Sequence, residues 1–107
     1  MAWRSALSRN LQELRIHLCQ SSKGSEGARD FIMSSYQELK KANPTFPILI
    51  RECAGVEAKL IARYDYGVEN AVRIEGLGKA DISKQLEELV KKGESMPRST
   101  ESEGALA

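Results

Sequence analysis

The two cysteines are the residues of this chain with the greatest capacity for chemistry. Cys19 closes one apolar run, residues 14–19, and Cys53 closes a second, residues 48–53. A pair of thiols can exchange with disulfides, lock a fold through a disulfide, or pack as small reduced hydrophobes. Their chemistry therefore depends on where the surrounding elements place them.

The elements around the two cysteines predict a strand, a helix and a second strand. Between the two runs, the helical spacing of an apolar stripe is clear, with Ser25 as a candidate N-cap and Pro44 as a stop. A crossover of this kind returns the chain in the same direction, so the strands are parallel and both thiols reach one sheet edge. That edge is the usual place for chemistry in α/β proteins. The residues of the stripe are Ala28, Phe31, Ile32, Ser35, Tyr36 and Leu39.

The second half of the chain predicts a hairpin followed by a helix. Residues 59–66 alternate between apolar and polar side chains, Gly67 provides a turn, and residues 71–75 form the returning antiparallel strand. A final amphipathic helix is expected from Gly78 to a stop at Gly93. Its apolar face consists of Ile82, Leu86, Leu89 and Val90.

This order of elements predicts an α/β fold of the thioredoxin-like class. We expect a four-stranded mixed sheet with strand order 2-1-3-4, built as βαβ and then ββα, with helices on both faces. We expect the thioredoxin-like domain to cover residues 11–93 and to be followed by a disordered tail, residues 94–107, which has no periodic apolar residues. Residues 1–10 contain Arg4 and Arg9 but no acidic residue, which is typical of a mitochondrial targeting segment; an ordinary frayed terminus is the alternative.

Charge and hydropathy exclude several classes of protein. Sixteen basic residues nearly balance fifteen acidic ones, so a large nucleic-acid footprint, which needs uncompensated basic residues, is disfavoured. No apolar run approaches the roughly 18 residues that a membrane-spanning helix requires. We therefore expect no nucleic-acid partner and no direct membrane insertion.

Five blocks of sequence resemble a known family. The chain is similar to the small thioredoxin-fold accessory subunits of mitochondrial respiratory complex I, NADH:ubiquinone oxidoreductase, whose domain family includes certain mitochondrial ribosomal proteins. The resemblance extends from residue 11 to about residue 90. The blocks are LRIHLCQ (14–20), GSEGARDF (24–31), ELKKANP (38–44), PILIREC (47–53) and ARY (62–64).

The resemblance implies a structural role without catalysis. Such a subunit supports assembly or stability of the matrix-exposed peripheral arm at the mitochondrial inner membrane, against the large iron–sulfur subunit and other complex I subunits. It carries no flavin, cluster or quinone, and we expect no cofactor here. Two cysteines are too few for an iron–sulfur cluster, which takes four ligands, and His17 is the only histidine. Ala58 departs from the family pattern, which has a proline before the Lys-Leu pair, and this puts a thioredoxin-like substrate groove in doubt.

Two alternatives stay open beside this interpretation. The first is a mitochondrial ribosomal protein of the same domain family, and the second is a thiol-disulfide redox protein. Redox enzymes of this fold use Cys-x-x-Cys, but Cys19 is followed by Gln20, Ser21 and Ser22. Cys19 and Cys53 are our candidate disulfide or redox pair, because the resembling family keeps cysteines at both places. Their disulfide would stabilise the fold by roughly 4 kcal/mol, whereas two reduced, packed thiols are the other outcome.

Other polar and aromatic residues are assigned simpler roles. His17, in the first strand, is expected to be a packed or hydrogen-bonded histidine rather than a ligand. The charges of residues 51, 52, 63 and 65 are read as solvated strand-edge groups, with an interfacial network as the alternative. Tyr64 and Tyr66 are expected to point the same way, either into the core or toward a partner.

Overall fold

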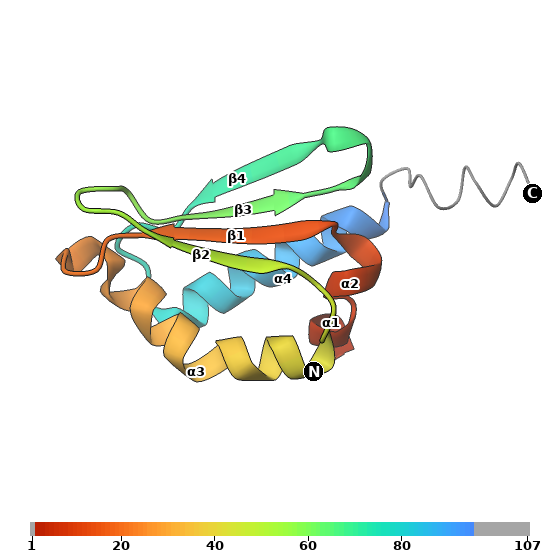
Figure 1. Ribbon diagram of the computed structural model, residues 1–107, viewed down its shortest axis with the longest axis horizontal. Helices are drawn as coiled ribbons and strands as arrows, with labels where there is room; N and C mark the ends of the chain where they lie inside the picture. The colour runs from red at the N-terminus through yellow and green to blue at the C-terminus, as the bar shows by residue number, and fades with distance from the viewer. Residues whose placement is uncertain (1, 96–107) are drawn as a thin grey trace, which may run out of the picture.

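The computed structural model describes residues 2–95 of the 107-residue chain. Two short helices precede a strand, a long helix, three further strands and a final long helix (Figure 1). Single turns of 3-10 helix lie at Lys23–Ser25 and Asp65–Gly67. The elements are α1 (Ala2–Ser5), α2 (Leu7–Asn10), β1 (Glu13–Leu18), α3 (Glu26–Ala42), β2 (Ile48–Glu52), β3 (Lys59–Arg63), β4 (Glu69–Arg73) and α4 (Lys79–Glu94).

The four strands form one mixed sheet in the order β2-β1-β3-β4. β1 pairs with β2 in parallel, whereas β3 is antiparallel to both β1 and β4. The predicted α/β class, strand order and strand directions are therefore confirmed. The arrangement is consistent with a thioredoxin-like fold.

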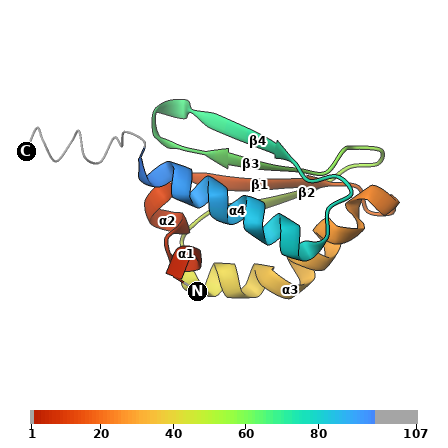
Figure 2. The same cartoon turned by 180° about the vertical axis from the view of Figure 1, so that it is seen from behind.

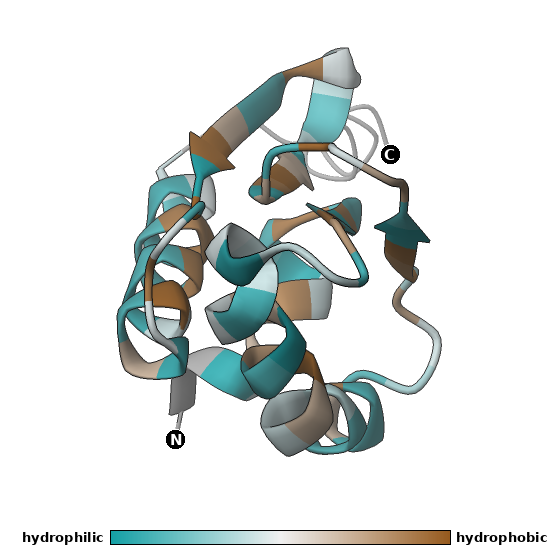
Figure 3. Ribbon diagram, turned by 90° about the vertical axis from the view of Figure 1, so that its left-hand side faces the viewer, coloured by the Kyte–Doolittle hydropathy of each residue, from teal (hydrophilic) through white to brown (hydrophobic). Residues whose placement is uncertain are grey.

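One face of the sheet carries the core. Along β1 the side chains of Leu14, Ile16 and Leu18 are buried, whereas Arg15 and His17 point to the other face and are only partly covered. This alternation follows the period of two of a strand. In the view of Figure 3, hydrophobic and hydrophilic residues are interspersed along the helices. Asn43 apart, the largest fully buried side chains are those of Leu7, Leu14, Ile16, Leu18, Leu39, Leu60, Tyr64, Ile74, Ile82, Leu86 and Val90.

The expectation that helices cover both faces of the sheet is wrong for residues 2–95. The helices α3 and α4 contact each other and lie on the same side of the sheet (Figures 1 and 2). A sheet of four strands about 4.8 Å apart is too wide to be covered by one helix of about 10 Å diameter. Both helices are therefore needed to cover its apolar face. The connection between β2 and β3, residues 53–58, contains no helix that could cover the opposite face.

The stripe predicted for α3 packs against the sheet as expected. Ala28, Phe31, Ser35 and Leu39 are buried, and α3 ends at Ala42. Ser25 occupies the N-cap position, but its side chain makes no capping bond. Its hydroxyl instead accepts a hydrogen bond from the backbone N–H of Cys19, at 3.0 Å.

The N-terminal segment is packed into the domain. Leu7 is fully buried, and Leu11 is also in the core. The side chain of Asn43, only 2% exposed, donates to the carbonyl oxygens of Arg4 and Leu39 and accepts from the backbone N–H of Ser8. The short helices α1 and α2 are thereby tied to the C-terminal end of α3. The packing therefore shows no boundary between the N-terminal segment and the domain at residue 10. A targeting role for residues 1–10 stays a prediction.

Gly93 has a different role from the predicted helix stop. The helix α4 continues through it to Glu94. A Cβ at this position would collide with the carbonyl oxygen of Asn10 and crowd the ring of Tyr64. Glycine is therefore needed because the backbone of α4 approaches the end of α2 so closely. The predicted disordered tail lies almost entirely outside the described residues, which end at residue 95.

The hairpin of β3 and β4 separates the two tyrosines. Tyr64 is buried, and its hydroxyl donates to the carbonyl oxygen of Leu89 at 2.7 Å. Tyr66 is 60% exposed and has a φ of 62°, so it belongs to the turn rather than to the strand. The prediction that both point the same way is wrong because the turn begins before Tyr66. As a result β4 runs over Glu69–Arg73, two residues earlier than expected.

Candidate functional site

Cys19 lies just beyond the end of β1 in a ring of backbone donors. Cys19 is buried, with 4% of its surface exposed. Hydrogen bonds from the backbone at Ser21, Gly55 and Ser22, in decreasing order of effect, lower the pKa of the Cys19 thiol from 9.0 to about 7; burial acts in the opposite direction. Such donors stabilise the thiolate because they point partial positive charge at the sulfur.

The lowered pKa predicts how the Cys19 thiol titrates and how stability changes with pH. We expect the ultraviolet absorbance of the Cys19 thiolate, followed in a Cys53→Ser variant, to rise with a midpoint near pH 7 in the folded protein. In urea the midpoint should rise to the ordinary range of a free thiol, about 8.5 to 9. Because the folded pKa is the lower one, the contribution to stability is fully present above the unfolded value and is lost as pH falls through 7. A Cys19→Ser variant should show neither effect, and a folded midpoint above pH 8 would contradict the geometry.

Cys53 follows β2 and is exposed. Its backbone N–H donates to the carbonyl oxygen of Leu18 at 3.0 Å, which continues the parallel pairing of β1 and β2 by one residue. Cys19 and Cys53 are therefore neighbours at the carboxyl end of these strands, as the sequence predicts. Both are free thiols, and their disulfide stays a prediction.

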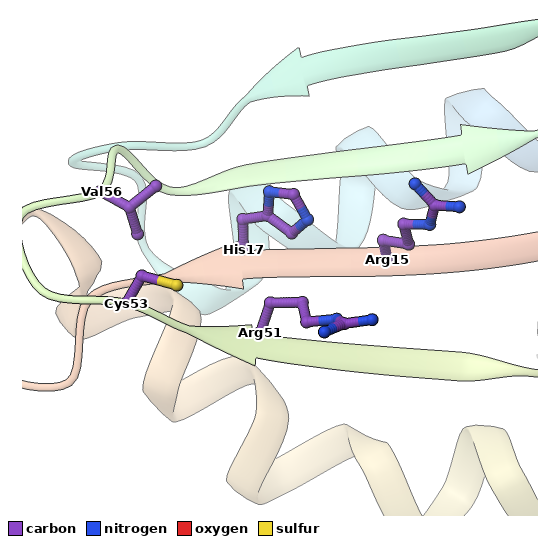
Figure 4. A pocket seen from close by; sticks show the side chains of 5 residues that line it. All are labelled: Arg15, His17, Arg51, Cys53 and Val56. Carbon is purple, nitrogen blue, oxygen red and sulfur yellow. The ribbon is translucent and has the colours of Figure 1, made fainter.

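A hollow of about 410 Å³ lies on the sheet face that carries no helix within the described residues. Figure 4 shows its lining: the side chains of β1 and β2 on this face and two residues of the loop that follows β2. Arg15 donates to the carboxylate of Glu13 at 2.8 Å. The residues that line the hollow are Arg15, His17, Arg51, Cys53 and Val56.

The other predicted charges do not gather at this hollow. Glu52 points to the helix side of the sheet, where it lines a different surface with Arg29 and Met33. Asp65, at the far end of β3, accepts a hydrogen bond from the side chain of Gln12. The proposed network of residues 51, 52, 63 and 65 is therefore divided between two faces and two ends of the sheet.

At Ala58 this chain departs from the family pattern, which has a proline at this position. Ala58 is fully buried, and its backbone N–H donates to Oε1 of Glu75 at 2.9 Å. A proline has no N–H and could not make this bond.

The arrangement can stabilise a thiolate but offers no local second thiol. Ser22 stands where Cys-x-x-Cys has its resolving cysteine, and its hydroxyl is buried with no hydrogen-bond partner. Within residues 2–95 no three His, Cys, Asp or Glu side chains are grouped to hold a metal ion. In the same part of the chain, every helix is too short or too polar to cross a membrane.

Comparison with known proteins places these features in a family. Residues 28–78 match the model of the mitochondrial ribosomal protein L51/S25/CI-B8 domain. The chain is 53% identical over 93 residues to NADH dehydrogenase (ubiquinone) 1 alpha subcomplex subunit 2 of Arabidopsis thaliana, which covers 87% of this chain and 96% of the relative. The chain belongs to the alpha subcomplex subunit 2 family.

Two further relatives are similar to the chain over most of their length. The mouse protein of the same name is 49% identical over 80 residues, 75% of this chain and 81% of the relative. The 10.5 kDa subunit of NADH-ubiquinone oxidoreductase from Neurospora crassa is 37% identical over 91 residues, 85% of this chain and 97% of the relative. The resemblance seen in the sequence is thereby confirmed, and the names of these relatives favour neither the ribosomal nor the redox alternative.

Proposed function

We propose that this protein is an accessory subunit of mitochondrial complex I at the inner membrane. The observation that carries the proposal is the alignment with the Arabidopsis relative, which is named as a subunit of NADH dehydrogenase and is matched over 96% of its length. Because the match spans almost the whole relative, we infer that the two chains have the same role. Its partners are then other complex I subunits.

The experiment is affinity purification of a tagged copy from detergent-solubilised mitochondria, followed by a native gel and mass spectrometry. We expect the tagged chain to co-migrate with complex I subunits. An unrelated tagged matrix protein of similar size, purified in the same way, is the control for non-specific recovery. Recovery with ribosomal proteins, or with no stable partner, would overturn the proposal.

The finer parts of the proposal concern catalysis, position and partner. The subunit acts without catalysis, on the matrix side, against the large iron–sulfur subunit of the peripheral arm. Support for the absence of turnover comes from Ser22, which provides a hydroxyl where exchange needs a second thiol. Disulfide reduction measured with insulin should be the same for wild type and Cys19→Ser, and a rate that requires Cys19 would favour the redox alternative.

The targeting role of residues 1–10 is part of the same proposal. Arg4 and Arg9 without any acidic residue fit an import segment. Fused to a fluorescent protein, these ten residues should direct it to mitochondria. The matched control replaces both arginines by glutamate, and equal import of the two fusions would contradict this role.

The two cysteines are proposed as a disulfide pair that stabilises the subunit. Support comes from the continued pairing of Leu18 with Cys53 and from the bond of Gly55 to the Cys19 sulfur, which keep the two residues together. Oxidised glutathione would accept two electrons from the two thiols, release two reduced glutathiones, and leave one Cys19–Cys53 bond.

The test of the disulfide compares melting temperatures with and without oxidised glutathione. Closing the loop between the cysteines should stabilise the wild type by roughly 4 kcal/mol, whereas Cys53→Ser should be unaffected. Because Cys53 is exposed, the serine itself should change stability little. Equal melting temperatures of oxidised and reduced wild type would contradict the pairing.

A further inference from the structure

The pairing register aligns four basic residues across the uncovered face of the sheet. His17 in β1 stands opposite Arg51 in β2 and also opposite Lys59 in β3, which in turn stands opposite Arg73 in β4. Arg51, Lys59 and Arg73 are exposed and His17 is partly covered. We call these four residues the basic row; Figure 4 shows its β1 and β2 members side by side.

Carboxylates balance the basic row only in part. Glu57 pairs with Arg73 at 3.0 Å, whereas within residues 2–95 no ion pair involves Arg51 or Lys59. Like charges directly opposite each other on neighbouring strands destabilise a sheet. The directly opposed Lys59 and Arg73 therefore cost stability in the isolated subunit, and a partner with acidic groups would remove that cost.

Beside the basic row runs a second row of mainly apolar side chains. Arg15, neutralised by Glu13, stands between Leu49 and Ile61, and Ile61 stands opposite Ala71. Leu49 and Ile61 are half-buried, although no helix within the described residues covers them. Apolar side chains flanked by charges are the pattern of a protein interface, with an apolar centre and a polar rim.

We propose that the basic row and the adjoining apolar row form the surface that docks an acidic segment of another complex I subunit. Charge complementarity selects this occupant, since its carboxylates would pair with Arg51 and Lys59 while its apolar side chains cover Leu49 and Ile61. A nucleic acid is a poorer fit, because sixteen basic residues nearly balance fifteen acidic ones over the chain, and because phosphates have no apolar side chains to cover Leu49 and Ile61. This inference rests on the proposed function and specifies the surface and chemistry through which it acts.

The first test uses the wild-type protein within purified complex I. A carbodiimide joins an amine directly to a carboxylate that is paired with it, so we expect Lys59 to be cross-linked to an aspartate or glutamate of another subunit. Lys84, exposed on α4 and away from this face, is the internal control and should be cross-linked far less. The inference would be overturned if Lys59 formed no cross-link to another subunit, or formed cross-links only within its own chain.

The second test separates docking from folding. Lys59→Glu places a carboxylate between His17 and Arg73, so the isolated variant should melt at the same or a higher temperature than wild type. Its incorporation into complex I should fall at least roughly tenfold, the effect of about 1.4 kcal/mol of lost binding. Lys84→Glu should leave incorporation unchanged. Lys59→Gln, which removes charge without reversing it, should give an intermediate loss and serves if the glutamate variant does not fold.

The outcomes distinguish this inference from the proposed function. Wild type that co-migrates with complex I, together with an equally incorporated Lys59→Glu variant, overturns the docking surface alone. Wild type that does not co-migrate overturns the proposed function and the inference with it. Salt-sensitive RNA binding by the wild type that Lys59→Glu abolishes would assign the basic row to a nucleic acid and overturn the acidic protein partner.

Discussion

Replacing Leu7 by alanine should lower the free energy of unfolding by about 2–5 kcal/mol, the usual cost of truncating a fully buried leucine. Leu7 has no exposed surface, and its helix α2 packs against α4. The surrounding groups are fixed by Asn43, which ties Arg4 and Ser8 to α3, so the cavity can collapse only in part. Urea denaturation followed by circular dichroism measures the effect.

Met33→Ala is the matched control for Leu7→Ala. Met33 is 85% exposed on α3, so its truncation should change stability by less than about 0.5 kcal/mol. A loss in Leu7→Ala that is no larger than in Met33→Ala would show that the N-terminal helices are detached from the core in solution. The two results together decide whether residues 2–10 belong to the folded unit.

Gly27→Ala should destabilise the protein by about 2 kcal/mol or more, against the direction that helix propensity predicts. Gly27 lies in the first turn of α3, where alanine is ordinarily better than glycine by about 0.5–1 kcal/mol. Here a Cβ would collide with the carbonyl oxygen of Leu77. Because that oxygen belongs to the backbone, either α3 or the loop before α4 would have to move.

Gly78→Ala is the control for Gly27→Ala. Gly78 lies on the same loop as Leu77, but a Cβ there would meet nothing within 4 Å and its φ is −79°. Its substitution should cost less than about 1 kcal/mol, the scale of a weakened N-cap. Thermal denaturation of both variants measures the difference, and a Gly27→Ala variant as stable as Gly78→Ala would refute the close approach.

The elements of this fold were predictable because each carries its own local signal. The α3 stripe has the period of a helix, and the residues of β1 alternate between a buried and an open face. Parallel pairing of β1 and β2 follows from the connection that separates them, so the neighbouring positions of Cys19 and Cys53 were also predictable. These inferences need only periodicity and chain direction.

What depended on contacts between distant residues was not predictable. The covering of a single sheet face follows from the width of the sheet relative to α3, which no local pattern contains. The burial of Leu7 and the close approach at Gly93 depend on α2 meeting the end of α4. Gly93 resembled a helix stop because glycine serves both purposes, and sequence alone does not distinguish a cap from a contact.

The candidate site was predicted in position but not in composition. Sequence located the thiols, yet the donors around Cys19 come from Ser21, Ser22 and the distant Gly55, which only the folded loop brings together. The basic row was missed because its members are far apart in the chain. Its signal was present in the alternation of β1 and β3, and the exact register would have revealed it.

The strand order has a consequence for the subunit before it finds its partners. With β2 and β4 at the two edges, each has backbone groups that could pair with the edge of a second copy and begin aggregation. Both edge strands are five residues long and end in charge: Arg51 and Glu52 close β2, and Glu69 and Arg73 bound β4. Short, charged edges oppose such pairing, so an excess of unassembled chains can persist as monomers in a crowded compartment.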